Sequence, residues 1–202
     1  MMIGARVSTA AVHDYFVTLD RAFSTVEVST GAGEPIDQQA GLAGAARAIR
    51  QASAAGRTLF VVGNGGSAGI ASQVTYAFTH FRAVPALCLN DPSALTGIGA
   101  DHGYGQVFSR QLAAYGRPGD FLIAISSSGQ SANILNAVAV ARANGFGILT
   151  LSGFKPENPL RRTGDINLYV DNRDYGFVEV SHLALCHAVL NAAVADDGPG
   201  RR

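Results

Sequence analysis

The feature that most constrains the fold of this chain is a series of short, unbroken apolar runs separated by segments with helical spacing. A strand that is buried on both faces reads as a continuous apolar run, because neither face meets water. Such strands alternating with helices are typical of a parallel sheet covered by helices on both sides. The sequence therefore predicts an α/β fold, a three-layer sandwich around a five-stranded parallel sheet. The expected strands are residues 58–62, 86–89, 121–125, 147–151 and 166–170.

Two helices are expected ahead of the first strand. Apolar residues three or four positions apart predict one helix over residues 8–24 and another over residues 37–55. Between them, residues 25–36 contain the sequence TGAGEP and are expected to form a loop. The apolar stripes of these helices would be Val12, Phe16 and Leu19 in the first, and Leu42, Ala45, Ala46 and Ile49 in the second.

The later helices and the chain ends complete the expected organisation. Residues 1–36 would be an N-terminal helical arm or flanking layer, residues 37–196 one α/β domain, and residues 197–202 a disordered tail. Further helices are expected from residue 67, over residues 104–115, from the loop 126–131 to Gly145, and over residues 175–195.

Composition narrows the class of protein. The 202 residues suit one domain, and 48% hydrophobic residues are enough for a substantial core. The formal net charge of zero gives no electrostatic footprint for nucleic acid or an anionic membrane. No apolar run approaches the roughly 20 residues that span a bilayer, and the start of the chain lacks the apolar core of a signal peptide. We therefore expect a cytoplasmic protein with neither nucleic acid nor a membrane as its partner.

The first candidate binding loop is a glycine cluster after the first strand, Gly63-Asn64-Gly65-Gly66-Ser67. Glycine permits positive φ and a close approach of the backbone to a ligand. The loop runs into a helix, whose first N–H groups lack partners within the helix and whose dipole favours an anion. Because ligands of parallel sheets bind beyond the carboxyl ends of the strands, this loop predicts an anion site there.

The second candidate loop follows the third strand and reads SSSGQS over residues 126–131. It places the hydroxyls of Ser126, Ser127, Ser128 and Ser131 between a strand end and a helix start. One Ser would be enough to cap the helix. Four hydroxyls and a glycine can surround a phosphate without a Lys or an Arg, so we expect this loop to bind a phosphate group.

A dinucleotide site is the alternative for the first loop. Gly63, Gly65 and Ala68 match the loose GxGxxA fingerprint, and Asp91 lies about twenty residues further on. The hydroxyl-rich second loop favours a phosphorylated sugar instead, because a dinucleotide crevice has no need of it. No Walker A sequence is present.

Three segments of the chain resemble the sugar isomerase (SIS) domain family. They are GNGGSA after the first strand, NDPSALTGIGADHGYGQVFSRQL in the middle, and ISSSGQSANI after the third strand. Within the family, the chain is most similar to the phosphoheptose isomerases, which convert sedoheptulose 7-phosphate into a manno-heptose 7-phosphate. The resemblance implies a five-stranded, flavodoxin-like sheet and a homotetramer with active sites between subunits. The N-terminal arm, residues 1–36, would pack in that oligomer.

The resemblance also implies roles for individual residues. The serine loop, with Ser126, Ser127, Ser128 and Ser131, would hold the phosphate of the substrate. The sugar end of the site would be lined by Asn64, Gly65, Ser67, Gln73 and Asp91.

The helix after GNGGS departs from the family pattern. The family has a His and a Glu four residues apart on this helix, which bind zinc together with a Gln and a His of the last helix. That Glu is also the catalytic base that the resemblance implies. In this chain Gln73 stands at the His position and Ala77 at the Glu position. Gln is a poor zinc ligand and Ala is none.

The last helix offers a replacement for the missing carboxylate. Glu179 stands where the family has its Gln, and His187 stands at the position of the ligand His. Eight residues separate two side chains by about 80° around a helix, so both can address one pocket. Exchange of an aldose and a ketose through an enediol needs a base and an acid. We expect Glu179 to be the base and His187 the acid, whereas His182 is expected to be a core residue.

Two alternatives stay open at the level of the sequence. The first is a zinc ion bound by His187 and Glu179. Two protein ligands are too few for a closed site, so His182 or a neighbouring subunit would have to complete it. The other concerns function. The leading interpretation is a phosphosugar aldose–ketose isomerase that acts on a heptose-class substrate. The alternative is a non-catalytic phosphosugar-binding protein, a sensor or scaffold, because Gln73 and Ala77 replace the family His and Glu.

Overall fold

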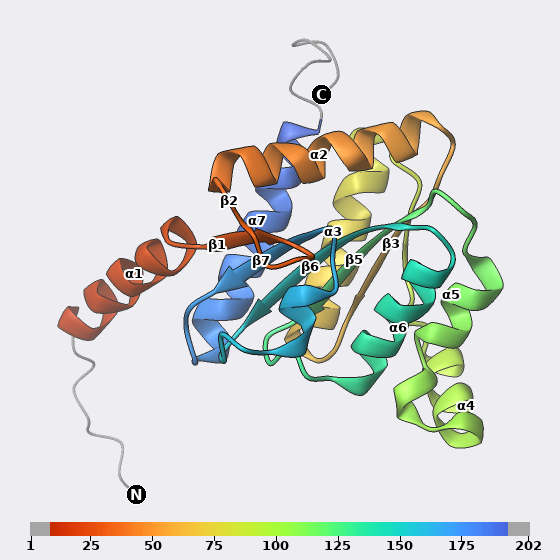
Figure 1. The fold of residues 1–202 in the computed structure, drawn as a ribbon. Helices are drawn as coiled ribbons and strands as arrows, with labels where there is room; N and C mark the ends of the chain where they lie inside the picture. Colours follow the sequence, from red (N-terminus) through yellow and green to blue (C-terminus); the bar gives the residue numbers. More distant parts are fainter. Residues whose placement is uncertain (1–8, 194–202) are drawn as a thin grey trace, which may run out of the picture.

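The computed structural model describes residues 9–193, and its centre is one mixed sheet with the strand order β2-β1-β7-β6-β5-β3-β4 (Figure 1). All five expected strands are present and pair in parallel. In chain order they are arranged 2-1-3-4-5, the flavodoxin-like order, so the predicted fold class is confirmed. The expected tail, residues 197–202, lies outside the described residues. The five strands are β3 (Leu59–Gly63), β4 (Ala86–Cys88), β5 (Phe121–Ser126), β6 (Gly147–Gly153) and β7 (Ile166–Val170).

Two further strands give the sheet seven strands rather than five, and the expectation of a loop over residues 25–36 is wrong. β1 (Glu27–Thr30) pairs antiparallel with β7 on one side and with β2 (Pro35–Ile36) on the other. Strands of four and two residues carry too little apolar pattern to be recognised in the sequence. They form because β7 offers an edge for pairing, which is a tertiary interaction and not a local preference.

Helices cover both faces of the sheet (Figure 1). Successive strand residues point to opposite faces. In β3, Leu59 and Val61 therefore belong to one buried apolar cluster, and Phe60 and Val62 to the other. The first cluster lies under α2 (Gln38–Ala54), α3 (Gly66–Arg82) and α7 (Tyr175–Ala192), and the second under α5 (Ser109–Tyr115) and α6 (Ala132–Ala143).

The helices between β4 and β5 begin and end at other residues than expected. The predicted helix over residues 104–115 is a 3-10 turn (Tyr104–Gln106) followed by α5, and an unexpected helix, α4 (Pro92–His102), precedes it. No residue of α4 is fully buried, although Leu95 and Ile98 pack against the second apolar cluster. Its signal lies in its start, where Asp91 accepts a hydrogen bond from the Ala94 N–H at 3.0 Å. A second 3-10 turn spans Pro159–Arg162.

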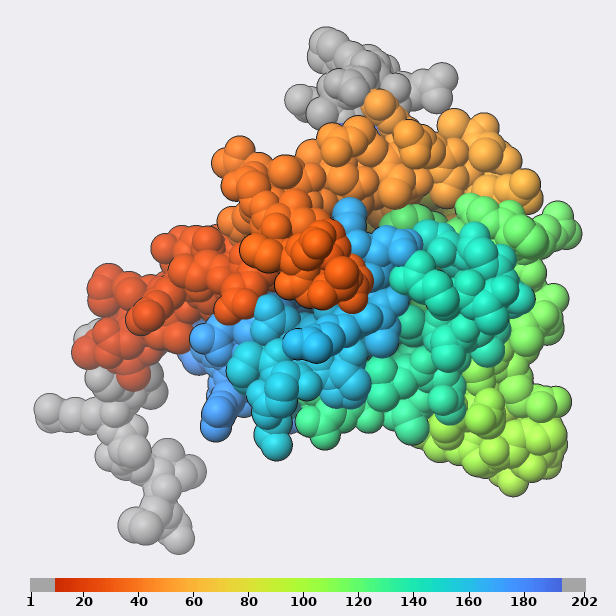
Figure 2. All heavy atoms as spheres, viewed as in Figure 1, coloured from red at the N-terminus to blue at the C-terminus, as the bar shows by residue number. Residues whose placement is uncertain are grey.

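The N-terminal helix α1 (Thr9–Ser24) projects from the body of the molecule (Figures 1 and 2). It contacts α7, and the rings of Tyr15 and Phe177 lie 4.8 Å apart between centroids. Two residues of its predicted stripe, Val12 and Phe16, are 51% and 62% exposed within one chain. The structure confirms the expected helix. Its packing in an oligomer stays a prediction. No helix of residues 9–193 is long and apolar enough to cross a membrane.

His182 lies in the core, as expected, and is fully buried. Its Nε2 lies 3.1 Å from the Ser152 carbonyl oxygen. Burial lowers the pKa of His182 from 6.5 to about 4, because the charged form loses its hydration. The neutral imidazole therefore donates its Nε2–H to Ser152.

The buried His182 makes stability depend on pH. Between pH 6.5 and about 4 the unfolded chain binds a proton at His182 that the folded chain does not bind. The free energy of unfolding should therefore fall as the pH falls through this window, by up to about 3 kcal/mol from this group. Urea denaturation at pH 7, 6 and 5 measures the slope. His182→Gln is the control, and an equal slope in both proteins would contradict the assignment.

Candidate functional site

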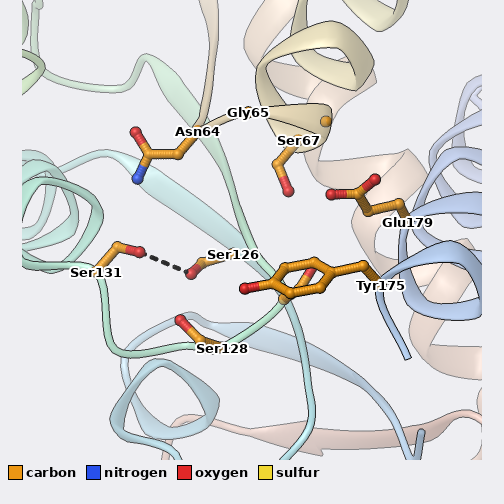
Figure 3. A pocket seen from close by; sticks show the side chains of 10 residues that line it. Asn64, Gly65, Ser67, Ser126, Ser128, Ser131, Tyr175 and Glu179 are labelled. Carbon is orange, nitrogen blue, oxygen red and sulfur yellow. Dashed lines mark hydrogen bonds between the residues drawn. The ribbon is translucent and has the colours of Figure 1, made fainter. Parts of the chain in front are cut away.

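The candidate site is a polar pocket at the carboxyl ends of the central strands β3 and β5 (Figure 3). The loops that follow these strands meet there, because the strands pair directly although they are far apart in the sequence. The first residues of α7 complete the wall. The lining residues are Asn64, Gly65, Gly66, Ser67, Ser126, Ser127, Ser128, Ser131, Tyr175 and Glu179.

The serine loop directs hydroxyls into this pocket. Ser131 occupies the N-cap position of α6, yet its side chain makes no capping hydrogen bond. Its hydroxyl instead lies 3.4 Å from that of Ser126 (Figure 3). Ser127 is 4% exposed, and its hydroxyl has no hydrogen-bond partner within residues 9–193. A buried hydroxyl without a partner is costly, so a ligand that bonds to it would be favoured.

One glycine fixes the shape of the serine loop. Gly129 has φ +62°, in the left-handed region that side chains disfavour. Its N–H donates to the Ser126 hydroxyl at 3.2 Å. A Cβ at this position would lie 2.0 Å from the Asn158 side-chain oxygen. The serine loop can therefore keep this conformation only with glycine at this position.

The glycine loop supplies the opposite wall. Gly65 is the N-cap of α3 with φ +53°, and no side chain caps the helix there. The first N–H groups of a helix lack partners within the helix, and its dipole favours negative charge. Ser67 belongs to this first turn and is 3% exposed. The two loops together present hydroxyls and a helix N-terminus to one space.

Asn64 is held in one orientation by its neighbours. Its Nδ2 donates to Asn133 Oδ1 at 2.9 Å, and Asn133 Nδ2 donates back to Asn64 Oδ1 at 2.8 Å. The Tyr104 hydroxyl also donates to Asn64 Oδ1, at 3.2 Å. Asn133 is 2% exposed and was not expected to take part. Its position two residues after the serine loop is the only sign of this role in the sequence.

Glu179 contributes a carboxylate to the pocket wall. It extends from α7 towards the start of α3 (Figure 3). A Cβ on Gly66 would meet both oxygens of this carboxylate, at 2.2 and 2.4 Å. The carboxylate therefore lies directly against the first turn of α3, where the helix dipole stabilises negative charge.

His187 lies further along α7 and is not among the residues that line the pocket. Its Nε2 lies 3.3 Å from the side-chain nitrogen of Gln73 on α3. The structure thus brings Gln73 and His187 together, next to each other across the α3–α7 contact. Of the expected acid–base pair, only Glu179 lines the pocket formed by the glycine loop and the serine loop.

The described residues do not fit a zinc site. Within residues 9–193 no group of three or more His, Cys, Asp or Glu side chains is placed to hold a metal ion. The side chain beside His187 is an amide, and Ala77 offers no ligand. Structural and catalytic zinc sites use at least three N, O or S ligands from the protein. Glu179 lies instead against Gly66.

For Asp91 and Tyr175 the structure differs from what the sequence led us to expect. Asp91, expected at the sugar end, is exposed and caps α4. Tyr175, which no sequence pattern singles out, is 61% exposed and lines the pocket at the start of α7. A sugar contact of Asp91 stays a prediction.

The contact between Gly66 and Glu179 can be tested with a pair of alanine variants on one helix. Gly66→Ala should fold with unchanged or slightly higher stability, because Ala is the better helix former, but should displace the Glu179 carboxylate. Gly69→Ala is the matched control, since a Cβ there meets nothing within 4 Å. Urea denaturation of both variants measures their stability, and their crystal structures show the position of the Glu179 carboxylate. A Glu179 carboxylate that stays in place in Gly66→Ala would contradict the described contact.

Similar proteins are known at the level of the sequence. The family model of the SIS domain matches residues 34–153, more than half of the chain. The phosphoheptose isomerase of Campylobacter concisus is 38% identical over 143 residues, which are 68% of this chain and 75% of that protein. The phosphoheptose isomerase of a Bradyrhizobium species is 40% identical over 153 residues, 70% of this chain and 76% of that protein.

Solved structures agree with this likeness. Phosphoheptose isomerase GmhA from Neisseria gonorrhoeae superposes with a TM-score of 0.80 at 29% identity, covering 92% of this chain and 98% of that one. A phosphoheptose isomerase from Francisella tularensis gives a TM-score of 0.79 at 27% identity, covering 91% and 96%. By sequence and by fold, the chain belongs to the SIS domain family.

Proposed function

We propose that the chain is a phosphosugar aldose–ketose isomerase whose substrate is sedoheptulose 7-phosphate or a closely related ketose phosphate. The observation that carries the proposal is the pocket itself, where a hydroxyl-rich loop, a helix N-terminus and one carboxylate face a common space. The phosphoheptose isomerases that are 38–40% identical to the chain support the choice of substrate.

The phosphate would bind at the serine loop. Four serines, Ser126, Ser127, Ser128 and Ser131, line the pocket, and no Lys or Arg is among its lining residues. Hydroxyls and backbone N–H groups can bind a phosphate by hydrogen bonds, and the start of α3 adds the favourable end of a helix dipole. The sugar chain would extend from there along α7, past Asn64 and Glu179.

The chemical step would be a proton transfer between C1 and C2 of the open-chain sugar. A base removes the proton from the carbon next to the carbonyl, an enediol forms, and the proton returns to the neighbouring carbon. An acid moves a second proton between the two oxygens. We assign the base to Glu179 and the acid to His187. Glu179 lines the pocket, whereas His187 lies about 12 Å further along the helix axis, beside Gln73 and outside the pocket of one chain, so the geometry of the pocket supports the assignment of Glu179 alone.

We also propose that the active unit is a homotetramer with sites at subunit contacts. Large apolar side chains are exposed on one chain, among them Phe16 of α1 and Tyr76 and Phe81 of α3, which are 62%, 55% and 55% exposed. Clustered exposed apolar residues are typical of protein–protein contacts. The rings of Tyr76 and Phe81 lie 5.5 Å apart and form such a cluster.

The assignment of the base predicts the effect of one isosteric change. Glu179→Gln should lower the turnover of sedoheptulose 7-phosphate by about 100-fold or more, because an amide cannot accept the proton. Glu157→Gln, an exposed site away from the pocket, is the matched control. The aldose phosphate product can be followed by NMR. Full turnover in Glu179→Gln would exclude Glu179 as the base. A wild type that binds sedoheptulose 7-phosphate without converting it would favour a non-catalytic phosphosugar sensor.

The donor set around His187 predicts the response to metal removal. With an amide beside His187 and no clustered ligands in residues 9–193, the turnover of sedoheptulose 7-phosphate should be unchanged after incubation with a chelator. Added zinc should not raise it. A loss that zinc restores would show that other residues, such as those of a second subunit, complete a metal site.

A further inference from the structure

The backbone of Phe154, directly after β6, adopts an unusual conformation. Phe154 has φ +60°, and among residues 9–193 only Ala83 shares a positive φ without being glycine. Such a conformation is strained for a bulky side chain and persists only where its surroundings enforce it. Two hydrogen bonds do so here. The Phe154 N–H donates to the Asn172 carbonyl at 2.9 Å, and the Phe154 carbonyl accepts from the Tyr169 hydroxyl at 3.2 Å.

This conformation places the Phe154 ring against Tyr175. The two ring centroids are 4.7 Å apart and the planes are at 86°, an edge-to-face contact that aromatic rings favour. The backbone of Tyr175 is fixed independently, because it begins α7 directly after the N-cap Asp174, which accepts from the Gly176 N–H at 2.7 Å. The orientation of an otherwise exposed side chain is thus set from two sides.

Tyr175 is the one aromatic residue among the ten that line the pocket. Figure 3 shows its ring extending from α7 towards the serine loop, with the hydroxyl directed at the Ser126 and Ser128 side. That hydroxyl has no hydrogen-bond partner within residues 9–193, although the residue lies in a polar pocket. An aromatic face beside a polar anion cradle offers a contact for C–H groups, and the free hydroxyl offers a hydrogen bond.

We propose that Tyr175 binds the carbon chain of the phosphorylated sugar next to its phosphate, and that Phe154 is the residue that positions Tyr175. The inference rests on the proposed function for the class of ligand. In this arrangement the serine loop recognises only the phosphate, whereas the Tyr175 ring packs on the sugar carbons and its hydroxyl bonds to a sugar hydroxyl. Tyr175 therefore makes the pocket selective for a sugar phosphate over free phosphate.

The test compares two ligands by calorimetric titration, sedoheptulose 7-phosphate and inorganic phosphate. Tyr175→Ala should weaken binding of the sugar phosphate about 10-fold, and binding of inorganic phosphate by less than about twofold. Tyr175→Phe, which keeps the ring, should give an intermediate loss. Tyr115→Ala is the matched control, because Tyr115 is 60% exposed and lies outside the pocket.

The positioning role needs its own pair of variants. Phe154→Ala should weaken binding of the sugar phosphate, as Tyr175→Ala does. Phe154→Tyr keeps the ring contact and should therefore bind the sugar phosphate as the wild type does. Equal losses for both ligands, or no loss in Tyr175→Ala, would overturn the proposal, as would a wild type that does not bind sedoheptulose 7-phosphate. A wild type that binds the sugar phosphate without converting it would contradict the isomerase assignment alone, because the titration measures binding and not turnover.

Discussion

The burial of the central strands on both faces is the constraint on which the rest of the structure depends. Because β3 and β5 are covered by helices on each side, they can exist only as continuous apolar strands that pair directly with each other. Their parallel pairing brings the ends of both strands to one edge of the sheet. The glycine loop and the serine loop meet there, although about sixty residues separate them in the chain. The pocket is therefore a consequence of the packing of the sheet.

One helix connects this packing to the chemistry. α7 buries His182 and Leu185 against the sheet and at the same time turns Tyr175 and Glu179 towards the pocket. These four residues are three or four positions apart and therefore share one face of α7, which lines the pocket at the start of the helix and packs in the core further along. The positions of the proposed sugar-binding and catalytic groups are thus fixed by a core contact. Their spacing along α7 should be insensitive to the surface loops.

The sequence predicted the features that depend on local pattern. Unbroken apolar runs located all five parallel strands, and the concentration of serine and glycine located both loops of the pocket. The hairpin β1–β2 and the placement of Tyr175 could not be predicted in this way. The first depends on the edge of β7, and the second on a strained backbone at Phe154 that is enforced by Asn172 and Tyr169. Such contacts join residues that no local pattern relates to each other.

The added hairpin also has a consequence for the behaviour of the protein at high concentration. Without it, β7 would expose five residues of unpaired backbone, a template on which another chain could add a strand. With it, the sheet ends in β2, two residues long and beginning with a proline, and on the other side in β4, three residues long. Short edge strands and an edge proline are features by which proteins avoid aggregation between sheets. The segment first expected to be a loop thus protects the sheet from joining that of a neighbouring molecule.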